Sequence, residues 1–254
     1  LSKETHAPGF ISKRIDFDTW IDWHDHHVLL KPAFPVNVMS PMATFDVQWG
    51  NVQRVTHRNT LWDMARFETC AHKWADLSEG NYGVALLNDC KYGYDIHHNV
   101  MRLSLLKSAT SPDPNADQGE HVMLYSLLPH TGDWRQNVVR EAYDLNNPLI
   151  MRRVSGGESR SLGSLVKVSP SNAIIETIKQ AEDGNGLIVR LFENERNRGI
   201  VTLTAGFDIA EAFVCNLLEE NQTSLDAIDN TLTFELTPYQ IVTLRLINRT
   251  ESHG

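Results

Sequence analysis

The sequence lacks the features that mark several classes of protein. No apolar run approaches the roughly 20 residues needed to span a bilayer, and nothing at the N-terminus resembles a signal peptide. Positive charge is scarce, because 23 Lys and Arg stand against 32 Asp and Glu, which gives a net charge of −9. This balance argues against nucleic acid or an anionic membrane as a partner and suits a neutral ligand.

Recognisable catalytic motifs are also missing. We find no Ser-His-Asp signature, no phosphate-binding glycine loop and no cluster with the spacing of metal ligands. His24 and His26 would share one face of a strand, yet no third ligand follows at a recognisable spacing. We therefore favour solvated histidines at a strand edge over a metal site.

Cysteine is rare and irregularly placed. Cys70, Cys90 and Cys215 are odd in number and far apart, which argues against a disulfide framework and for reduced thiols in a cytoplasmic protein. We expect all three to be small buried side chains. The chain starts at Leu1 rather than Met, so we interpret it as a piece of a longer polypeptide.

What is present is ordinary globular material, 41% hydrophobic and 22% charged, with the hydrophobic pattern of β-strands. Alternating or short continuous apolar runs predict strands at residues 14–23, 43–49, 52–55, 84–87, 101–105 and 122–128. Gly50-Asn51 predicts a tight hairpin turn, and Phe67, Trp74 and Leu77 are candidate core residues. Residues 138–145 fit either a short helix or an edge strand.

The residue composition of the sequence changes near residue 160. Six further short strands are predicted beyond it, at residues 174–178, 187–193, 200–204, 213–218, 232–236 and 241–247. Their spacing is typical of a small β-sandwich. We predict an all-β protein with two domains, residues 1–160 and residues 161–254.

Two stretches concentrate polar and aromatic groups. Residues 82–95 begin as a buried strand and end in polar and aromatic side chains around Gly93, which permits close approach of a ligand. Residues 56–63 show no period, so we expect a loop, and their Trp, Asn, Asp and Arg suit a sugar. The plainer alternatives are a hairpin end whose tyrosines cover the core and a polar loop anchored by one Trp.

Four blocks of the sequence resemble the C-terminal region of glycoside hydrolase family 38 α-mannosidases, most closely the cytosolic and vacuolar type. In order, these blocks are residues 56–68, 72–79, 82–95 and 112–121. The resemblance continues more weakly to Leu246 and so covers nearly the whole chain. It implies a large antiparallel supersandwich, similar to galactose mutarotase-like folds, followed by a smaller β-sandwich.

The resemblance also implies that catalysis belongs to another domain of the polypeptide. Family 38 enzymes are retaining α-mannosidases whose zinc or cobalt site and catalytic carboxylates lie in an N-terminal domain, and no residue of this chain matches those motifs. We therefore expect no catalytic residue and no cofactor in this chain. The expected partners are an upstream catalytic domain and an α-mannoside oligosaccharide, and association into a homo-oligomer stays open. The candidates for lining the sugar pocket or an interdomain surface are His57, Asn59, Trp62, Asp63, Arg66, Tyr92, Tyr94 and Asp95.

Two other functions stay open at this point. The density of Trp and Tyr also suits an independent carbohydrate-binding module. The expected fold is shared with sugar mutarotases and epimerases, which would need a His/Glu acid–base pair acting on a free sugar. Fold alone does not choose between these functions.

Overall fold

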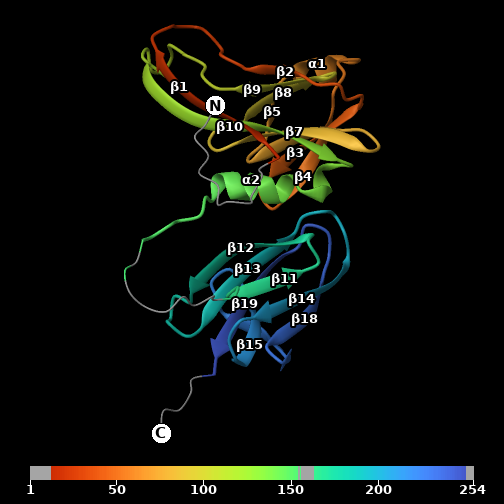
Figure 1. Ribbon diagram of the computed structural model, residues 1–254, viewed down its shortest axis with the longest axis vertical. Coiled ribbons are helices and arrows are strands. Elements are labelled where there is room, and N and C mark those ends of the chain that lie inside the picture. Colours follow the sequence, from red (N-terminus) through yellow and green to blue (C-terminus); the bar gives the residue numbers. More distant parts are fainter. Residues whose placement is uncertain (1–12, 154, 156–162, 250–254) are drawn as a thin grey trace. The chain divides into compact units, whose positions relative to one another are not determined.

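A computed structural model describes residues 13–153, 155 and 163–249 (Figure 1). Contacts divide the chain into two compact units, Leu1–Met151 and Arg152–Gly254, which we call unit 1 and unit 2. The predicted domain boundary near residue 160 lies among residues 156–162, outside the described residues.

Unit 1 is built from two antiparallel sheets. The six-stranded sheet has the order β1 (Ile15–Trp23), β10 (Gly119–Thr131), β7 (Tyr82–Asn88), β6 (Trp74–Ser78), β3 (Met42–Val47) and β4 (Gly50–Val55). The four-stranded sheet has the order β2 (Ala33–Pro35), β9 (Val100–Ser104), β8 (Gly93–His97) and β5 (Thr69–Cys70). Apolar side chains from both sheets, such as Phe45, Leu77 and Leu103, form one core cluster.

The continuous apolar run of β7 has a physical reason. Val84 and Leu86 join the core cluster that both sheets share, whereas Ala85 and Leu87 belong to a second cluster. Because successive side chains of a strand point to opposite faces, a strand buried on both faces needs no polar alternation.

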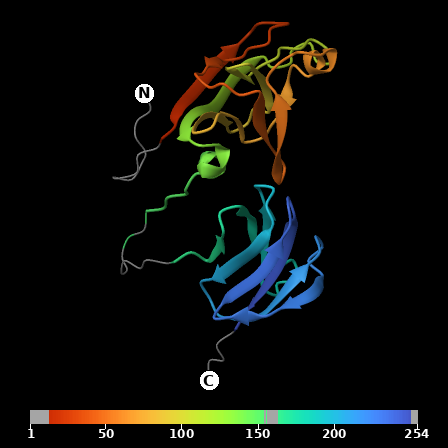
Figure 2. The ribbon, with the colours of Figure 1, turned by 90° about the vertical axis from the view of Figure 1, so that its right-hand side faces the viewer.

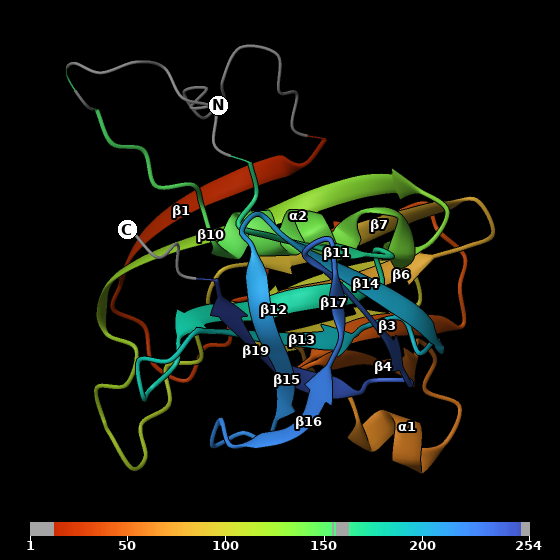
Figure 3. The same cartoon turned by 90° about the horizontal axis from the view of Figure 1, so that it is seen from below.

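The second cluster is completed by two helices, η1 (Trp134–Gln136) and α2 (Val138–Asn146). Val138, Ala142 and Leu145 are the buried residues of α2, and Figures 1 and 3 show this helix beside β7. Trp134 stacks on Trp74 of β6 with 5.3 Å between ring centroids. The open choice for residues 138–145 is thus resolved as a helix, because their apolar spacing follows one helical face.

Unit 2 is a second antiparallel sandwich, whose strands run from green to blue in Figure 2. One sheet has the order β12 (Ala173–Gln180), β13 (Leu187–Glu193), β19 (Ile241–Asn248), β15 (Ile209–Cys215) and β16 (Asn221–Leu225). The other has the order β11 (Val166–Ser169), β14 (Gly199–Ala205), β18 (Thr231–Leu236) and β17 (Ala227–Ile228). Residues of both sheets, including Leu191, Leu203, Leu232 and Leu244, form one core. The predicted all-β class is therefore confirmed.

Several local predictions were wrong in register. The β3–β4 turn is formed by Gln48 and Trp49, with Trp49 at φ 56°, and Gly50 already pairs with Val47. The strand predicted to end before Pro129 continues to Thr131, because β10 stays paired with β7 up to Tyr82. On its other side β1 pairs only as far as Leu127, so Pro129 lies at an edge, where proline is tolerated.

Some burial predictions also failed. Phe67 is exposed rather than a core residue, although Trp74 and Leu77 are buried as expected. Cys70 and Cys90 are exposed and only Cys215 is buried, so two of the three thiols do not fill a core.

Candidate functional site

A small hollow in unit 1 gathers half of the predicted site residues. It has a volume of about 140 Å³ and lies between the end of β4, the segment that follows it and strand β8. The predicted residues that line it are His57, Asp63, Arg66 and Asp95.

Asp95 is the charged centre of the hollow. It lies on β8 opposite Arg102 of β9, and its two carboxylate oxygens accept from Arg58 Nη2 at 3.3 Å and Arg102 Nη1 at 3.5 Å. The Asp95 side chain is 15% exposed, whereas Arg58 and Arg102 are each about a third exposed. Each guanidinium carries five N–H donors, so Arg58 and Arg102 can bind a hydroxyl while they pair with Asp95.

Asp63 is held by a helix that the sequence prediction missed. Residues expected to form a loop contain α1 (Leu61–Ala65), which Thr60 caps by accepting from the Asp63 backbone N–H at 3.1 Å. The Asp63 carboxylate accepts from the Thr60 backbone N–H at 3.1 Å and from its hydroxyl at 2.8 Å, which completes a capping box. The Thr60-x-x-Asp63 spacing was the sequence signal that could have predicted the start of this helix.

His57 lies next to Asp63 in the hollow. Its Nδ1 lies 3.6 Å from Asp63 Oδ2, and this nitrogen is buried with no hydrogen-bond partner among the described residues. A buried ring nitrogen without a hydrogen-bond partner is uncommon, and here the nearby Asp63 carboxylate is its neighbour.

His97 also lines the hollow and was not predicted as a site residue. Burial, Arg58 and His98 lower the pKa of the His97 imidazole, which therefore stays neutral near pH 7. Its ring packs against that of His98, with centroids 4.2 Å apart. His98 and Asn99 form the turn between β8 and β9, and the register of this hairpin sets Asp95 opposite Arg102; this pairing is the signal that could have revealed the arginine.

The other predicted residues lie elsewhere. Tyr94 is a correction, because its side chain has no exposed surface and contacts Phe45 and Asn88 in the core. Burial raises the pKa of the Tyr94 phenol, and no ligand can reach it. Trp62 and Tyr92 are exposed by 77% and 55%, and Asn59 is exposed.

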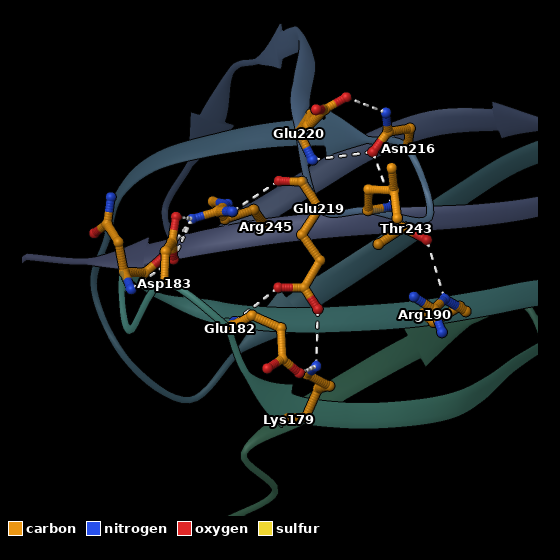
Figure 4. A network of polar contacts seen from close by, with 11 residues as sticks. Lys179, Glu182, Asp183, Arg190, Asn216, Glu219, Glu220, Thr243 and Arg245 are labelled. Carbon is orange, nitrogen blue, oxygen red and sulfur yellow. Dashed lines mark hydrogen bonds and ion pairs between the residues drawn. The ribbon is translucent and has the colours of Figure 1, made fainter.

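A second polar cluster lies in unit 2 and is shown in Figure 4. Arg245, nearly buried on β19, donates to Asp183 at 2.7 Å, to the Asn185 carbonyl at 2.9 Å and to the Glu219 carbonyl at 2.7 Å. Lys179 pairs with the Glu219 carboxylate at 2.9 Å. These contacts tie two loops to the sheet, so we interpret the cluster as structural.

The described residues do not fit a metal site or a membrane span. They contain no group of three or more His, Cys, Asp or Glu side chains able to hold a metal ion. Over the same part of the chain, no helix has the length and apolar character needed to cross a membrane.

Sequence comparison identifies the family. The profile for "Glycosyl hydrolases family 38 C-terminal domain" matches residues 11–115, and that for "Glycosyl hydrolases family 38 C-terminal beta sandwich domain" matches residues 172–244. The chain belongs to glycosyl hydrolase family 38. The predicted resemblance is confirmed, and the two profiles fall on the two units in order.

Curated relatives of this family 38 chain are much longer. It is 40% identical to Alpha-mannosidase 2C1 of Mus musculus over 239 residues, which are 92% of the chain and 23% of the relative. It is 31% identical to Alpha-mannosidase of Saccharomyces cerevisiae over 257 residues, covering 92% of the chain and 24% of the relative. The chain thus spans about a quarter of the length of these relatives.

A solved structure supports the fold of this family 38 chain. An alpha-mannosidase from Enterococcus faecalis V583 matches with a TM-score of 0.76 and 19% identity, over 92% of this chain and 27% of that one. At this identity, the similarity concerns the fold.

Proposed function

We propose that this chain is the supporting C-terminal part of a retaining α-mannosidase that hydrolyses terminal α-mannosides, and that its hollow forms an outer wall of the sugar pocket. The observation that carries the proposal is the gathering of His57, Asp63, Arg66 and Asp95 in one hollow of unit 1. The relatives named as alpha-mannosidases support the substrate class.

The hollow suits one edge of a sugar rather than a whole ligand. Its volume of about 140 Å³ is below the roughly 300–1,000 Å³ of pockets that enclose small ligands. Asp95 accepts hydrogen bonds and Arg58 donates them. These groups match the alternating donors and acceptors of sugar hydroxyls.

The same contacts argue against catalysis by the hollow itself. Retaining hydrolysis needs a nucleophilic carboxylate and a second carboxyl group that gives and takes a proton. Asp95 is paired with two arginines, and Asp63 accepts two hydrogen bonds within its capping box, so both carboxylates already serve contacts within the fold.

We therefore assign the catalytic carboxylates, and the zinc or cobalt ion expected for the family, to the part of the polypeptide beyond this chain. The described residues offer no ligand cluster that fits such an ion. The exposed free thiols of Cys70 and Cys90 support a cytoplasmic location, where thiols stay reduced.

Substitution of Asp95 in the complete polypeptide tests the wall of the pocket. Asp95→Asn is expected to raise KM for an α-mannoside about tenfold with little change in kcat, because binding is lost in ground state and transition state alike. Asp133→Asn is the matched control, since Asp133 pairs with Arg135 outside the hollow. Equal KM values for Asp95→Asn and the control would refute the pocket role.

A free-standing carbohydrate-binding module is the second candidate, favoured by the exposed rings of Trp62 and Tyr92. It predicts saturable binding of mannose by this chain alone. A flat calorimetric titration with millimolar mannose would count against it.

A further inference from the structure

Strand β1 forms one margin of the six-stranded sheet of unit 1. Among the described strands it pairs with β10 alone, and its nine residues stay in register from Ile15 to Trp23 without a shift. Figure 3 shows this strand, in red, beside β10 at the margin of the sheet. The other side of β1 therefore presents backbone N–H and C=O groups that no described strand pairs with.

The edge of β1 lacks the usual protection against pairing. Proteins commonly protect an edge strand with a proline, a lysine, a bulge or a short length, and β1 has none of these. Its only charged residues are three aspartates. A long and regular strand edge is the surface to which an extended peptide can add as a further strand.

One face of β1 also offers exposed side chains beside this edge. Asp18, Trp20 and Asp22 share that face because side chains alternate along a strand, and Val122 of β10 lies opposite Trp20. Trp20 and Val122 are 61% and 72% exposed, and both aspartates are exposed. The indole of Trp20 is thus an open apolar surface with a carboxylate on either side.

The charge around Trp20 indicates a cationic partner. Residues 15–30 and 108–134, which contain β1 and β10, each hold four Asp or Glu and no Lys or Arg. Asp18 and Glu120 are exposed, and neither forms an ion pair with a described residue. A guanidinium or ammonium group binds well both to carboxylates and to the face of an indole. A second copy of β1 would instead set aspartates against aspartates, which is unfavourable.

We propose that β1 is a docking edge for an extended basic segment of another protein, which adds to the sheet as a strand and carries Arg or Lys at alternate positions. The cationic side chains of this segment face Asp18, Trp20 and Asp22, while its backbone pairs with that of β1. The proposal does not depend on the proposed function, because no residue of β1 lines the hollow.

A synthetic peptide of about ten residues, with arginine at every second position and threonine between, tests the proposal. A dye on the peptide reports binding to the complete polypeptide by fluorescence anisotropy. We expect saturable binding, with a Kd about tenfold higher for Trp20→Ala because an aromatic anchor is lost. Trp62→Ala is the matched control, since Trp62 is a 77% exposed ring of unit 1 that lies on α1, and its Kd is expected to equal that of wild type.

Two further peptides separate strand addition from attraction of charge alone. A peptide with N-methylated backbone amides at alternate residues keeps its charge but cannot pair as a strand, and a peptide with glutamate in place of arginine reverses the charge. Neither is expected to bind. Equal Kd values for the first peptide and its N-methylated form, or for wild type and Trp20→Ala, would overturn the proposal, and so would no binding of the first peptide.

Two other results would assign the edge of β1 to a different occupant. Binding by the 254-residue chain that the complete polypeptide lacks would mean that the rest of the polypeptide covers the edge. Self-association of the complete polypeptide that Trp20→Ala abolishes, measured by sedimentation, would mean that a second copy covers it. Either result would overturn the proposal of a basic partner.

Discussion

Removing His130 is expected to destabilise unit 1 far more than removing a comparable exposed histidine. His130 Nε2 on β10 lies 2.7 Å from Asp76 Oδ1 on β6, and the two side chains are 5% and 0% exposed. In His130→Ala, the buried Asp76 carboxylate keeps only the hydrogen bond from Ser78 among those of the described residues. Breaking a buried ion pair from one side costs about 3–5 kcal/mol.

A second His–Asp pair in the same unit supplies the control. His24 Nε2 lies 2.9 Å from Asp22 Oδ1, but these side chains are 74% and 46% exposed. Exposed pairs contribute at most about 1 kcal/mol, so His24→Ala is expected to change stability little. The residue types and pairing match, and burial is the main difference between the two sites.

Tryptophan fluorescence in guanidinium chloride measures the effect in unit 1 alone, because all six tryptophans lie at or before Trp134. With a slope of about 4 kcal/mol/M, the midpoint of His130→Ala falls by about 1 M. Asp76→Asn/His130→Ala is expected to recover part of that loss, since no charge stays buried without a partner. A midpoint for His130→Ala within error of that for His24→Ala would show that the buried pair adds no stability. A double variant no more stable than His130→Ala would show that packing, not charge, is lost.

Three further predictions concern the buried contacts of unit 1 and the Arg245 cluster of unit 2. Gly83→Ala places a Cβ against the His130 ring and 2.8 Å from Ser78 Cβ. The free energy of unfolding of unit 1 is therefore expected to fall by about 1–3 kcal/mol, measured by tryptophan fluorescence. Burial lowers the pKa of His130, but the hydrogen bond and the charge of Asp76 outweigh burial and raise this pKa overall. The stabilisation that results is fully present below about pH 6.5 and is lost as the pH rises through the folded-state pKa. The stability difference between wild type and Asp76→Asn/His130→Ala should therefore shrink above that pH, and a difference that grows would contradict the assignment. Arg245→Met is expected to speed amide exchange in the loops around residues 183–185 and 216–220 while leaving tryptophan fluorescence unchanged, and unchanged exchange would remove the structural role given to Arg245.

Strands with a clear hydrophobic period were predictable. The prediction for residues 187–193 coincides with β13, and the buried run at 84–87 lies within β7. β16 was missed because its five residues are almost all exposed and show no apolar alternation. The strand predicted at 213–218 was shifted, because Leu217 and Leu218 are exposed in a turn rather than buried in β15.

The candidate site was predictable in composition but less so in geometry. Tyr94 and Asp95 are neighbours in sequence, yet strand alternation sends Tyr94 into the core and leaves Asp95 in the hollow. Arg58 and Arg102 reach Asp95 from 37 and 7 residues away, and only the folded hairpin brings Arg102 opposite it. These contacts depend on the register of the β8–β9 hairpin and on the path of the segment after β4, which residue types alone do not reveal.

We propose that this chain supports a sugar site whose chemistry belongs to the rest of the polypeptide. Release of mannose from a synthetic α-mannoside, compared at equal molar concentration for this 254-residue chain and the complete polypeptide, distinguishes this arrangement from catalysis within the chain. We expect hydrolysis by the complete polypeptide and none above background by the chain alone. Turnover by the isolated chain that is abolished by substitution of one of its own carboxylates would overturn the proposal.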